Sequence, residues 1–177
     1  MRELVEYAYF TGMKTVYLVR HAKSSWAIDD IPDKDRPLKG RGIRDAHMIS
    51  EYLSETMNFN LNIKLCASSA TRALHTALIF AQNFKIPAGD IAVKDELYHC
   101  DVDELHRHVI ETEDHIDLLF IFAHNPGITD YVNSVSEAGI KNVPTTGVVG
   151  LSFPINRWSE AQNHGKCMLF EYPKRLK

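Results

Sequence analysis

The sequence has little that would mark a secreted, membrane or zinc-binding protein. Its three cysteines stand far apart in 177 residues, at positions 66, 100 and 167, so neither a disulfide framework nor a paired-cysteine zinc site is predicted. No apolar run approaches the roughly 20 residues needed to cross a bilayer, and the first residues are too acidic for a secretory signal. Internal repeats and low-complexity stretches are also missing. We therefore expect one globular domain in the reducing environment of the cytoplasm.

Positive charge is not in excess either. The chain has 20 lysines and arginines against 23 aspartates and glutamates, which gives a formal net charge of −3 at pH 7. A general affinity for nucleic acid or for a membrane surface is therefore not expected. A site for an anion must arise where a few basic side chains are brought together locally.

Short apolar runs alternate with helical patterns along the chain, which is typical of α/β proteins. Six segments predict strands, at about residues 14–20, 63–67, 91–93, 118–123, 148–155 and 166–172. The predicted fold is a three-layer α/β/α sandwich around a mainly parallel central sheet of about six strands, with antiparallel strands in the C-terminal part. We expect residues 13–177 to form this single domain and residues 1–12 to be an N-terminal extension.

Helical patterns between these strands begin near residues 40, 69, 101 and 125. Ser68 or Ser69 is the expected N-cap of the second helix. Asp101 and Glu104 have the spacing of a capping box at the start of the third helix. Asn125 is the expected N-cap of the fourth helix, with the proline that follows it at the first helical position.

Basic and imidazole side chains follow three of the predicted strands, at the edge where ligands bind in open α/β sheets. Arg20 and His21 end the first strand, His124 ends the fourth, and Arg72 lies in the first turn of the helix after the second strand. Histidine can attack phosphorus near neutral pH, and arginine can hold two phosphate oxygens through parallel hydrogen bonds. The free N–H groups at the helix start after Asn125 would add to an anion site. The sequence therefore predicts a phosphate site and a phosphoryl-transfer enzyme.

Several short motifs follow one another along the chain. They are Val-Arg-His-Ala-Lys-Ser at 19–24, Asp-Arg-Pro-Leu at 35–38 with Gly-Arg-Gly at 40–42, Ser-Ser-Ala-Thr-Arg-Ala at 68–73, Ala-His-Asn-Pro-Gly-Ile at 123–128, Thr-Thr-Gly at 145–147 and Pro-Lys-Arg-Leu at 173–176. In this order they resemble the histidine phosphatase superfamily, and in particular its compact SixA-type phosphohistidine phosphatases. The resemblance covers about residues 13–177, and Ala123 departs from it because glycine is common at that place.

The resemblance implies a role for each residue of the predicted site. His21 would be the nucleophile that becomes phosphorylated. Arg20, Arg72 and His124 would bind the phosphoryl oxygens, with Asn125 as a further phosphate-binding residue. Water would then hydrolyse the phosphohistidine, and neither a metal ion nor a cofactor would be required.

A general acid would protonate the leaving group of an ester substrate. Glu96 is the candidate, because it resembles the family's acid, and its neighbour Asp95 is the alternative.

Several functions stay open at this point. The segment between the second helix and Glu96 is only about a dozen residues long, which predicts an open pocket and favours phosphohistidine on a protein as the substrate. A small-molecule phosphomonoesterase of the same superfamily and a non-catalytic phosphate-binding module are the alternatives. A metal-dependent hydrolase would use the potential ligands between His99 and His108 instead, although their spacing does not fit a zinc helix.

Overall fold

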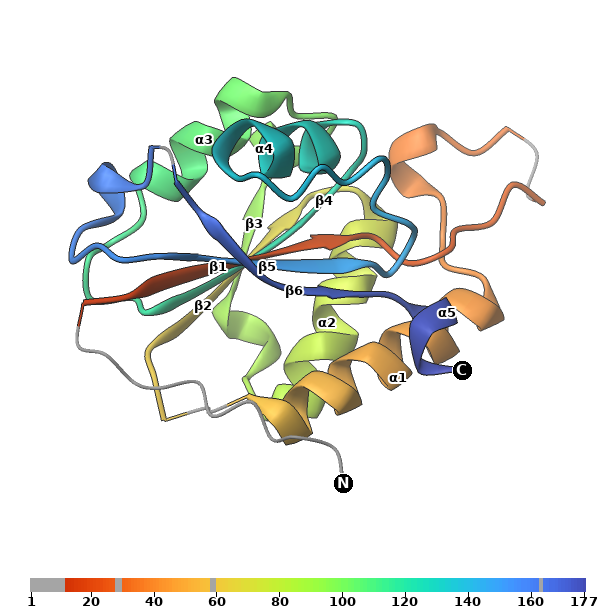
Figure 1. The fold of residues 1–177 in the computed structure, drawn as a ribbon. Helices are drawn as coiled ribbons and strands as arrows, with labels where there is room; N and C mark the ends of the chain where they lie inside the picture. The colour runs from red at the N-terminus through yellow and green to blue at the C-terminus, as the bar shows by residue number, and fades with distance from the viewer. Residues whose placement is uncertain (1–11, 28–29, 58–59, 163) are drawn as a thin grey trace.

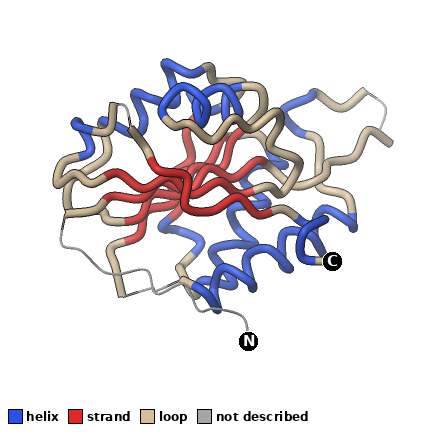
Figure 2. Tube along the Cα trace, in the orientation of Figure 1, coloured by secondary structure: helices blue, strands red, loops and turns tan. Residues whose placement is uncertain are grey.

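A mixed β-sheet runs through the middle of the molecule, with helices on both of its faces (Figures 1 and 2). The computed structural model describes residues 12–27, 30–57, 60–162 and 164–177. Within these residues the sheet has six strands in the order β3-β2-β4-β1-β5-β6. Their bounds are β1 Lys14–Arg20, β2 Ile63–Ser68, β3 Ile91–Lys94, β4 Leu118–Ala123, β5 Val148–Phe153 and β6 Lys166–Glu171.

Strand direction divides the sheet into two parts. β1 pairs in parallel with β4, and β2 pairs in parallel with both β3 and β4. β5 is antiparallel to both of its neighbours, β1 and β6. The predicted mainly parallel sheet with antiparallel strands in the C-terminal part is therefore confirmed.

The helices form the two outer layers. Their bounds are α1 Gly40–Thr56, α2 Thr71–Phe84, α3 Val102–Ile110, α4 Gly127–Val135 and α5 Pro173–Leu176, with single 3-10 turns η1 Asp33–Asp35, η2 Ala88–Asp90, η3 Asp95–Leu97 and η4 Trp158–Glu160. In Figure 1, α1, α2 and α5 lie on one side of the sheet, and α3 and α4 lie on the other. This arrangement is the predicted three-layer sandwich.

The two cores follow from the alternation of side chains along each strand. In β1, Val16 and Leu18 belong to the apolar cluster under α3 and α4, whereas Tyr17 and Val19 belong to the cluster under α1 and α2. β4 is buried at every position, as expected for a strand whose two faces are both covered. No helix in the described part of the chain is both long and apolar enough to span a bilayer.

The predicted helix starts have mixed outcomes. The capping box of Asp101 and Glu104 is present at the start of α3. The other two expected caps are wrong. Ala70 precedes α2 without a side-chain cap, and Ser68 contacts the histidine that follows the neighbouring strand instead. α4 begins at Gly127, one residue later than expected, because the Asn125 amide donates to the segment before β5.

The predicted N-terminal extension falls almost entirely on residues 1–11, which lie outside the described residues. The domain boundary near residue 13 stays a prediction.

Candidate active site

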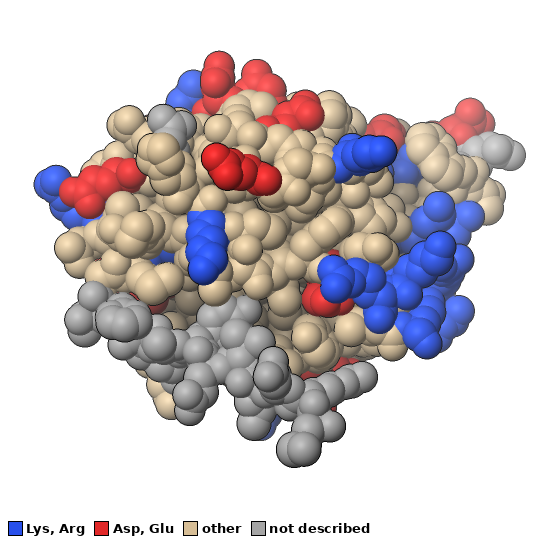
Figure 3. Space-filling view, viewed as in Figure 1, with Lys and Arg blue, Asp and Glu red and all other residues tan. Residues whose placement is uncertain are grey.

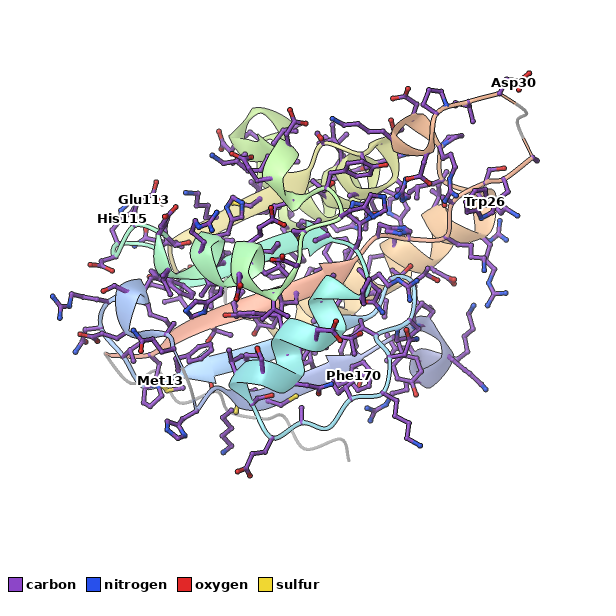
Figure 4. The ribbon with its side chains drawn as sticks, turned by 90° about the horizontal axis from the view of Figure 1, so that it is seen from above. Met13, Trp26, Asp30, Glu113, His115 and Phe170 are labelled. Atoms are coloured by element: carbon purple, nitrogen blue, oxygen red, sulfur yellow. The ribbon has the colours of Figure 1, made fainter. Side chains whose placement is uncertain are left out.

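Two histidines lie side by side because the strands that carry them are parallel neighbours. Arg20, the last residue of β1, is in register with Ala123, the last residue of β4. The next residues, His21 and His124, therefore leave the sheet together, and their ring centroids are 5.1 Å apart. In Figure 4, Trp26 and Asp30, on the loop after β1, lie at this edge, whereas Met13, Glu113 and His115 lie at the opposite edge. The site forms at the carboxyl ends of the parallel strands, as predicted.

The ring of His21 is held in one orientation. It is 9% exposed, and its Nδ1 lies 2.8 Å from the carbonyl oxygen of Ala22. A carbonyl oxygen only accepts hydrogen bonds, so Nδ1 carries the hydrogen of the neutral ring and Nε2 keeps its lone pair. Burial, and then the charges of Arg72, Arg20 and Arg36, lower the pKa of His21 to about 4, although the Ala22 carbonyl opposes the shift. At neutral pH the ring is uncharged, and Nε2 carries the lone pair that a nucleophilic histidine needs.

His124 has a partner on one side of its ring and none on the other. Its Nε2 lies 2.8 Å from Oγ of Ser68, and this hydroxyl also accepts a hydrogen bond from the backbone N–H of Ala70. When the hydroxyl donates its own hydrogen to Nε2, the neutral ring carries its hydrogen on Nδ1. Burial, followed by the charges of His21 and Arg72, lowers the pKa of His124 to about 3. His124 is therefore a neutral, buried hydrogen-bond donor.

The guanidinium of Arg20 is fixed by the segment before β5. One of its outer nitrogens, Nη1, donates to the carbonyl oxygen of Val143 at 2.8 Å and lies 3.4 Å from Oδ1 of Asn142. The amide of Asn125 donates to the same two oxygens, at 3.1 and 2.9 Å. Arg20 and Asn125 are therefore linked through shared acceptors, which places Asn125 beside Arg20 at this edge of the sheet.

Arg72 is a buried cation in the first turn of α2, with only 3% of its surface exposed. Its Nη2 donates to Oδ2 of Asp33 at 2.9 Å, and its Nη1 donates to the backbone carbonyl oxygen of the same residue at 2.5 Å. Thr76, one turn further along α2, accepts a hydrogen bond from the backbone N–H of Ala22 at 2.9 Å. This bond places the start of α2 against the residue that follows His21.

Three N–H groups on the predicted site residues lack a hydrogen-bond partner among the residues that the structure describes. They are Nε of Arg20, Nε of Arg72 and Nδ1 of His124, and all three are buried. A buried donor without an acceptor costs about 1–3 kcal/mol. Two of the three belong to cations, so an anion with several oxygens is the ligand that would satisfy them best.

The backbone next to the site is strained at Thr146. This residue is 1% exposed and has a φ of 63°, a left-handed conformation that costs a β-branched residue about 1–3 kcal/mol. Its N–H donates to the carbonyl oxygen of Arg20 at 3.1 Å and to that of His21 at 3.3 Å. The strained turn therefore bonds the carbonyl groups of the two peptides on either side of the His21 Cα.

The structure does not bring Glu96 into contact with these residues. Glu96 is exposed on η3, and its charge acts on His108 of α3. Asp95 is also exposed, and its carboxylate forms an ion pair of 2.7 Å with Lys34. The role of Glu96 as general acid, with Asp95 as alternative, stays a prediction.

Asp33 is a carboxylate at the site that the sequence did not predict. Its Oδ2 accepts hydrogen bonds from Tyr98 at 2.8 Å and Arg72 at 2.9 Å, and lies 3.4 Å from Nε2 of His99. Burial alone would raise the pKa of Asp33, but the hydrogen bonds from Tyr98 and Arg72, with the charges of Arg72 and Arg36, lower it to about 2. Asp33 is therefore a carboxylate at neutral pH.

The potential metal ligands between His99 and His108 do not converge. The ring of His99 lies 5.4 Å from that of His124, whereas His106 lies 6.2 Å from the ring of Tyr131. Across the described ranges, no group of three or more His, Cys, Asp or Glu side chains is arranged to hold a metal ion. The described residues therefore give no support to the alternative of a metal-dependent hydrolase.

Sequence reasoning missed Ser68 and Asp33 as members of the site. Ser68 ends β2, and β2 pairs with β4 up to Ala67 and Phe122, so its contact with His124 follows from the strand order. That order was the missing signal. No pattern in the loop before α1 distinguishes Asp33 from its neighbours Asp30 and Asp35.

The comparisons with known proteins agree with this arrangement. The family model of the histidine phosphatase superfamily (branch 1) matches residues 16–125, which include the two histidines and the two arginines. The chain belongs to the histidine phosphatase superfamily. It is therefore a phosphatase of the class that uses a histidine nucleophile.

Similar proteins span nearly the whole chain. A candidate phosphohistidine phosphatase SixA from Nakamurella multipartitia has a TM-score of 0.77 at 23% identity, covering 92% of this chain and 97% of its own. The protein histidine phosphatase SixA in complex with tungstate has a TM-score of 0.77 at 17% identity, covering 92% of this chain and 99% of its own. An uncharacterized protein of Mycobacterium leprae is 26% identical over 169 residues, which are 88% of this chain and 100% of that protein. The fold is thus that of the SixA-type proteins.

Proposed function

We propose that this protein transfers a phosphoryl group from its substrate to His21 and then to water, without a metal ion or a cofactor. The observation that carries the proposal is the set of three buried donors without partners, on Arg20, Arg72 and His124, beside a neutral histidine. Two of them carry positive charge, which is what the oxygens of a phosphoryl group require.

The first step is an in-line displacement. Nε2 of His21 attacks phosphorus with its lone pair, a P–N bond forms, and the bond from phosphorus to the leaving group breaks. Because the Ala22 carbonyl accepts the Nδ1 hydrogen at 2.8 Å, the positive charge that develops on the ring is stabilised as the bond forms. Water then attacks the phosphohistidine, and inorganic phosphate and the neutral ring of His21 are released.

The remaining residues bind the phosphoryl oxygens. Arg20 and Arg72 would donate from Nε and supply charge, and His124 would donate from Nδ1 as a neutral ring. Asn125 would act at the same edge, next to Arg20, with which it shares the acceptors Asn142 and Val143. These contacts spread the negative charge of the transferring group, so the need for a metal ion is met by the chain's own cations.

We propose phosphohistidine on a protein as the substrate. The leaving imidazole, once protonated, departs as a neutral group, so this reaction depends less on a general acid than ester hydrolysis does. The described residues place no carboxylate donor against His21, and Asp33 is held ionised. The tungstate complex of the similar SixA protein supports an oxyanion site in this fold.

The surface beside the site also supports a protein substrate. Figure 3 shows lysine and arginine side chains gathered on one face, over α5 and the start of α1. The exposed basic residues of these two elements and of the preceding position are Lys39, Arg41, Arg44, Lys174, Arg175 and Lys177. The backbone N–H of Lys39 donates to the carbonyl oxygen of Lys23 at 2.8 Å, so this basic face begins two residues from His21. It would attract an acidic protein surface to the mouth of the site.

A phosphomonoesterase for small molecules is the alternative function, with Glu96 as the acid for its leaving group. A non-catalytic binding module is less consistent with a neutral His21 whose Nδ1 is held by the Ala22 carbonyl oxygen, so that Nε2 keeps its lone pair. The three cysteines are unpaired, which suits the cytoplasm as the place of action.

The proposal is tested by trapping the intermediate. The protein is mixed briefly with a phosphoramidate carrying labelled phosphorus, denatured at alkaline pH, and assayed for label that is stable to base and labile to acid. We expect label on the wild type and on His115→Ala, the control at the opposite edge, and none on His21→Ala. Equal label on His21→Ala would show that another residue is the nucleophile.

A further inference from the structure

The carboxylate of Asp33 accepts a hydrogen bond from Arg72, one of the two arginines that would bind a phosphoryl group. Arg72 uses both of its outer nitrogens on this one residue, Nη2 on the carboxylate at 2.9 Å and Nη1 on the backbone carbonyl at 2.5 Å. Two oxygens held by the two arms of one guanidinium is the geometry in which arginine binds phosphate. Asp33 thus presents Arg72 with two acceptors of its own.

The other partners of Asp33 also suit an anion. Tyr98 donates its hydroxyl hydrogen to Oδ2, and Nη1 of Arg36 lies 3.3 Å from Oδ1. His99 is the third neighbour, with Nε2 3.4 Å from Oδ2. The ring of Tyr98 lies 5.6 Å from the ring of His124. The Asp33 carboxylate therefore lies in the same small region as Arg72 and His124.

The free Nε of Arg72 can hold one phosphoryl oxygen, but a phosphoryl group held at two points by Arg72 would also lie against an outer nitrogen that Asp33 occupies. Each outer nitrogen already donates to an oxygen of Asp33. A phosphoryl group bound to the same guanidinium would be repelled by the Asp33 carboxylate. The carboxylate is the part that can leave, because 40% of the Asp33 side chain is exposed while Arg72 is 3% exposed. Asp33 stands on η1, a single 3-10 turn in the loop between β1 and α1.

We propose that Asp33 is an internal competitor for the phosphate site, which an incoming phosphoryl group must displace from Arg72. The inference rests on the proposed function, in which Arg72 binds the phosphoryl group. Before substrate binds, the carboxylate neutralises a buried guanidinium and keeps weakly bound anions out. Asp33 is therefore a residue that sets which anions enter the site.

The loop around Asp33 is fastened to the rim of the site at two points. Lys34 forms an ion pair of 2.7 Å with Asp95, and Arg36 donates to the hydroxyl of Ser24. The Arg36 guanidinium also lies 3.3 Å from the centre of the Trp26 ring, and Trp26 is 73% exposed. A substrate protein that contacts this rim would touch the same loop that carries the competing carboxylate.

The test is the affinity for inorganic phosphate, measured by titration calorimetry at constant ionic strength and neutral pH. Asp33→Asn keeps the shape of the side chain and removes its charge, so we expect phosphate to bind about tenfold more tightly. Asp35→Asn is the matched control, because it removes the same charge from an exposed residue on the same turn. We expect its affinity to equal that of the wild type within about twofold.

The opposite result would show a different role for Asp33. Equal or weaker binding of phosphate by Asp33→Asn would mean that the carboxylate holds Arg72 in place for the ligand, and the inference would be wrong. Asp33→Ala provides a second variant, and a thermal melt establishes that each variant is folded.

A failure of the proposed function would be distinguishable. Arg72→Gln should lose phosphate binding if the phosphate site is the one proposed here. Binding by the wild type that is lost in Arg72→Gln and unchanged in Asp33→Asn overturns the competition alone. Binding that is absent in all variants, or unchanged in Arg72→Gln, overturns both proposals.

Discussion

Ser68 and His124 contact each other through Oγ and Nε2 at a distance of 2.8 Å, and both residues are almost fully buried. The serine ends β2 and the histidine follows β4, two parallel strands that are neighbours in the sheet. The contact fixes the orientation of the imidazole, and it leaves Nδ1 as the atom that can donate to a substrate oxygen.

Loss of this contact should lower activity. Ser68→Ala leaves Nε2 of His124 without its partner, so the ring is free to change its orientation and tautomer. We expect kcat to fall at least about tenfold and the free energy of unfolding to fall by about 1–3 kcal/mol. Steady-state kinetics with p-nitrophenyl phosphate and urea unfolding would measure the two effects.

The control for this prediction is Ser54→Ala. The hydroxyl of Ser54 donates to the local carbonyl oxygen of Glu51 within α1, so kcat should not change. Wild-type kcat in Ser68→Ala would contradict the role of the serine in orienting His124.

Acid should destabilise the protein through its two buried histidines. The pKa of His21 is lowered to about 4 and that of His124 to about 3 in the folded protein. In the unfolded chain each has a pKa of about 6.5. Between these values the unfolded state binds protons that the folded state does not, so the folded state loses stability as pH falls below about 6.5. Above that pH, this contribution is fully present.

We expect the free energy of unfolding to fall by about 1–2 kcal/mol per histidine between pH 7 and pH 5. Urea unfolding of the wild type and of His21→Asn at both pH values measures the share of His21. The variant should lose less stability on acidification than the wild type does, whereas the exposed control His115→Asn should lose as much. An identical pH dependence in His21→Asn would show that His21 titrates normally.

The role of Glu96 can be tested by comparing activity on substrates with different leaving groups. Aryl phosphates have leaving groups that depart without protonation, whereas alkyl phosphates need a general acid. If Glu96 supplies that proton, Glu96→Gln should keep most of the aryl phosphatase activity and lose at least about tenfold on alkyl phosphates. Asp95→Asn tests the neighbouring alternative in the same assay. Equal losses on both substrates would count against the assignment.

The start of α4 should tolerate no side chain larger than hydrogen at Gly127. A Cβ at this position would overlap the backbone carbonyl oxygen of Cys100, far inside van der Waals contact. We expect Gly127→Ala to destabilise the fold by about 1–3 kcal/mol and to reduce activity, because His124 lies three residues before it. Thermal melting and kcat measure the two effects.

Gly89→Ala is the matched control, since nothing lies within 4 Å of a Cβ at that position. Wild-type stability in Gly127→Ala would mean that the backbones of Gly127 and Cys100 can move apart without a loss of stability.

The layers of the fold could be predicted because their signal is local. The short apolar run of β1, the fully apolar β4 and the capping box of α3 each depend on a few neighbouring residues. The expected caps of α2 and α4 were wrong for a reason that lies elsewhere in the chain. Ser68 and Asn125 had partners 56 and 17 residues away, and those contacts took precedence over local capping.

The candidate site was predicted in part for the same reason. His21, Arg72 and His124 converge because parallel strands end at one edge, which a sequence pattern can anticipate. The contact between Arg72 and Asp33 joins residues 39 apart through an irregular loop, and no periodicity marks such a pair. Interactions of this kind depend on the path of a loop, which composition alone does not determine.

The reversal of β5 has a consequence for how the molecule is built. Had that strand run the other way, its preceding segment would have emerged at the far end of the sheet. Because it is antiparallel to β1, Val148 is in register with Val19, and Phe153 is in register with Lys14. Residues 142–147 thereby return to meet Arg20, while the connection to β6 is a full strand's length distant. Substitutions in the connection between β5 and β6 should therefore leave anion binding unchanged. Substitutions in residues 142–147 change the contacts that hold the Arg20 guanidinium.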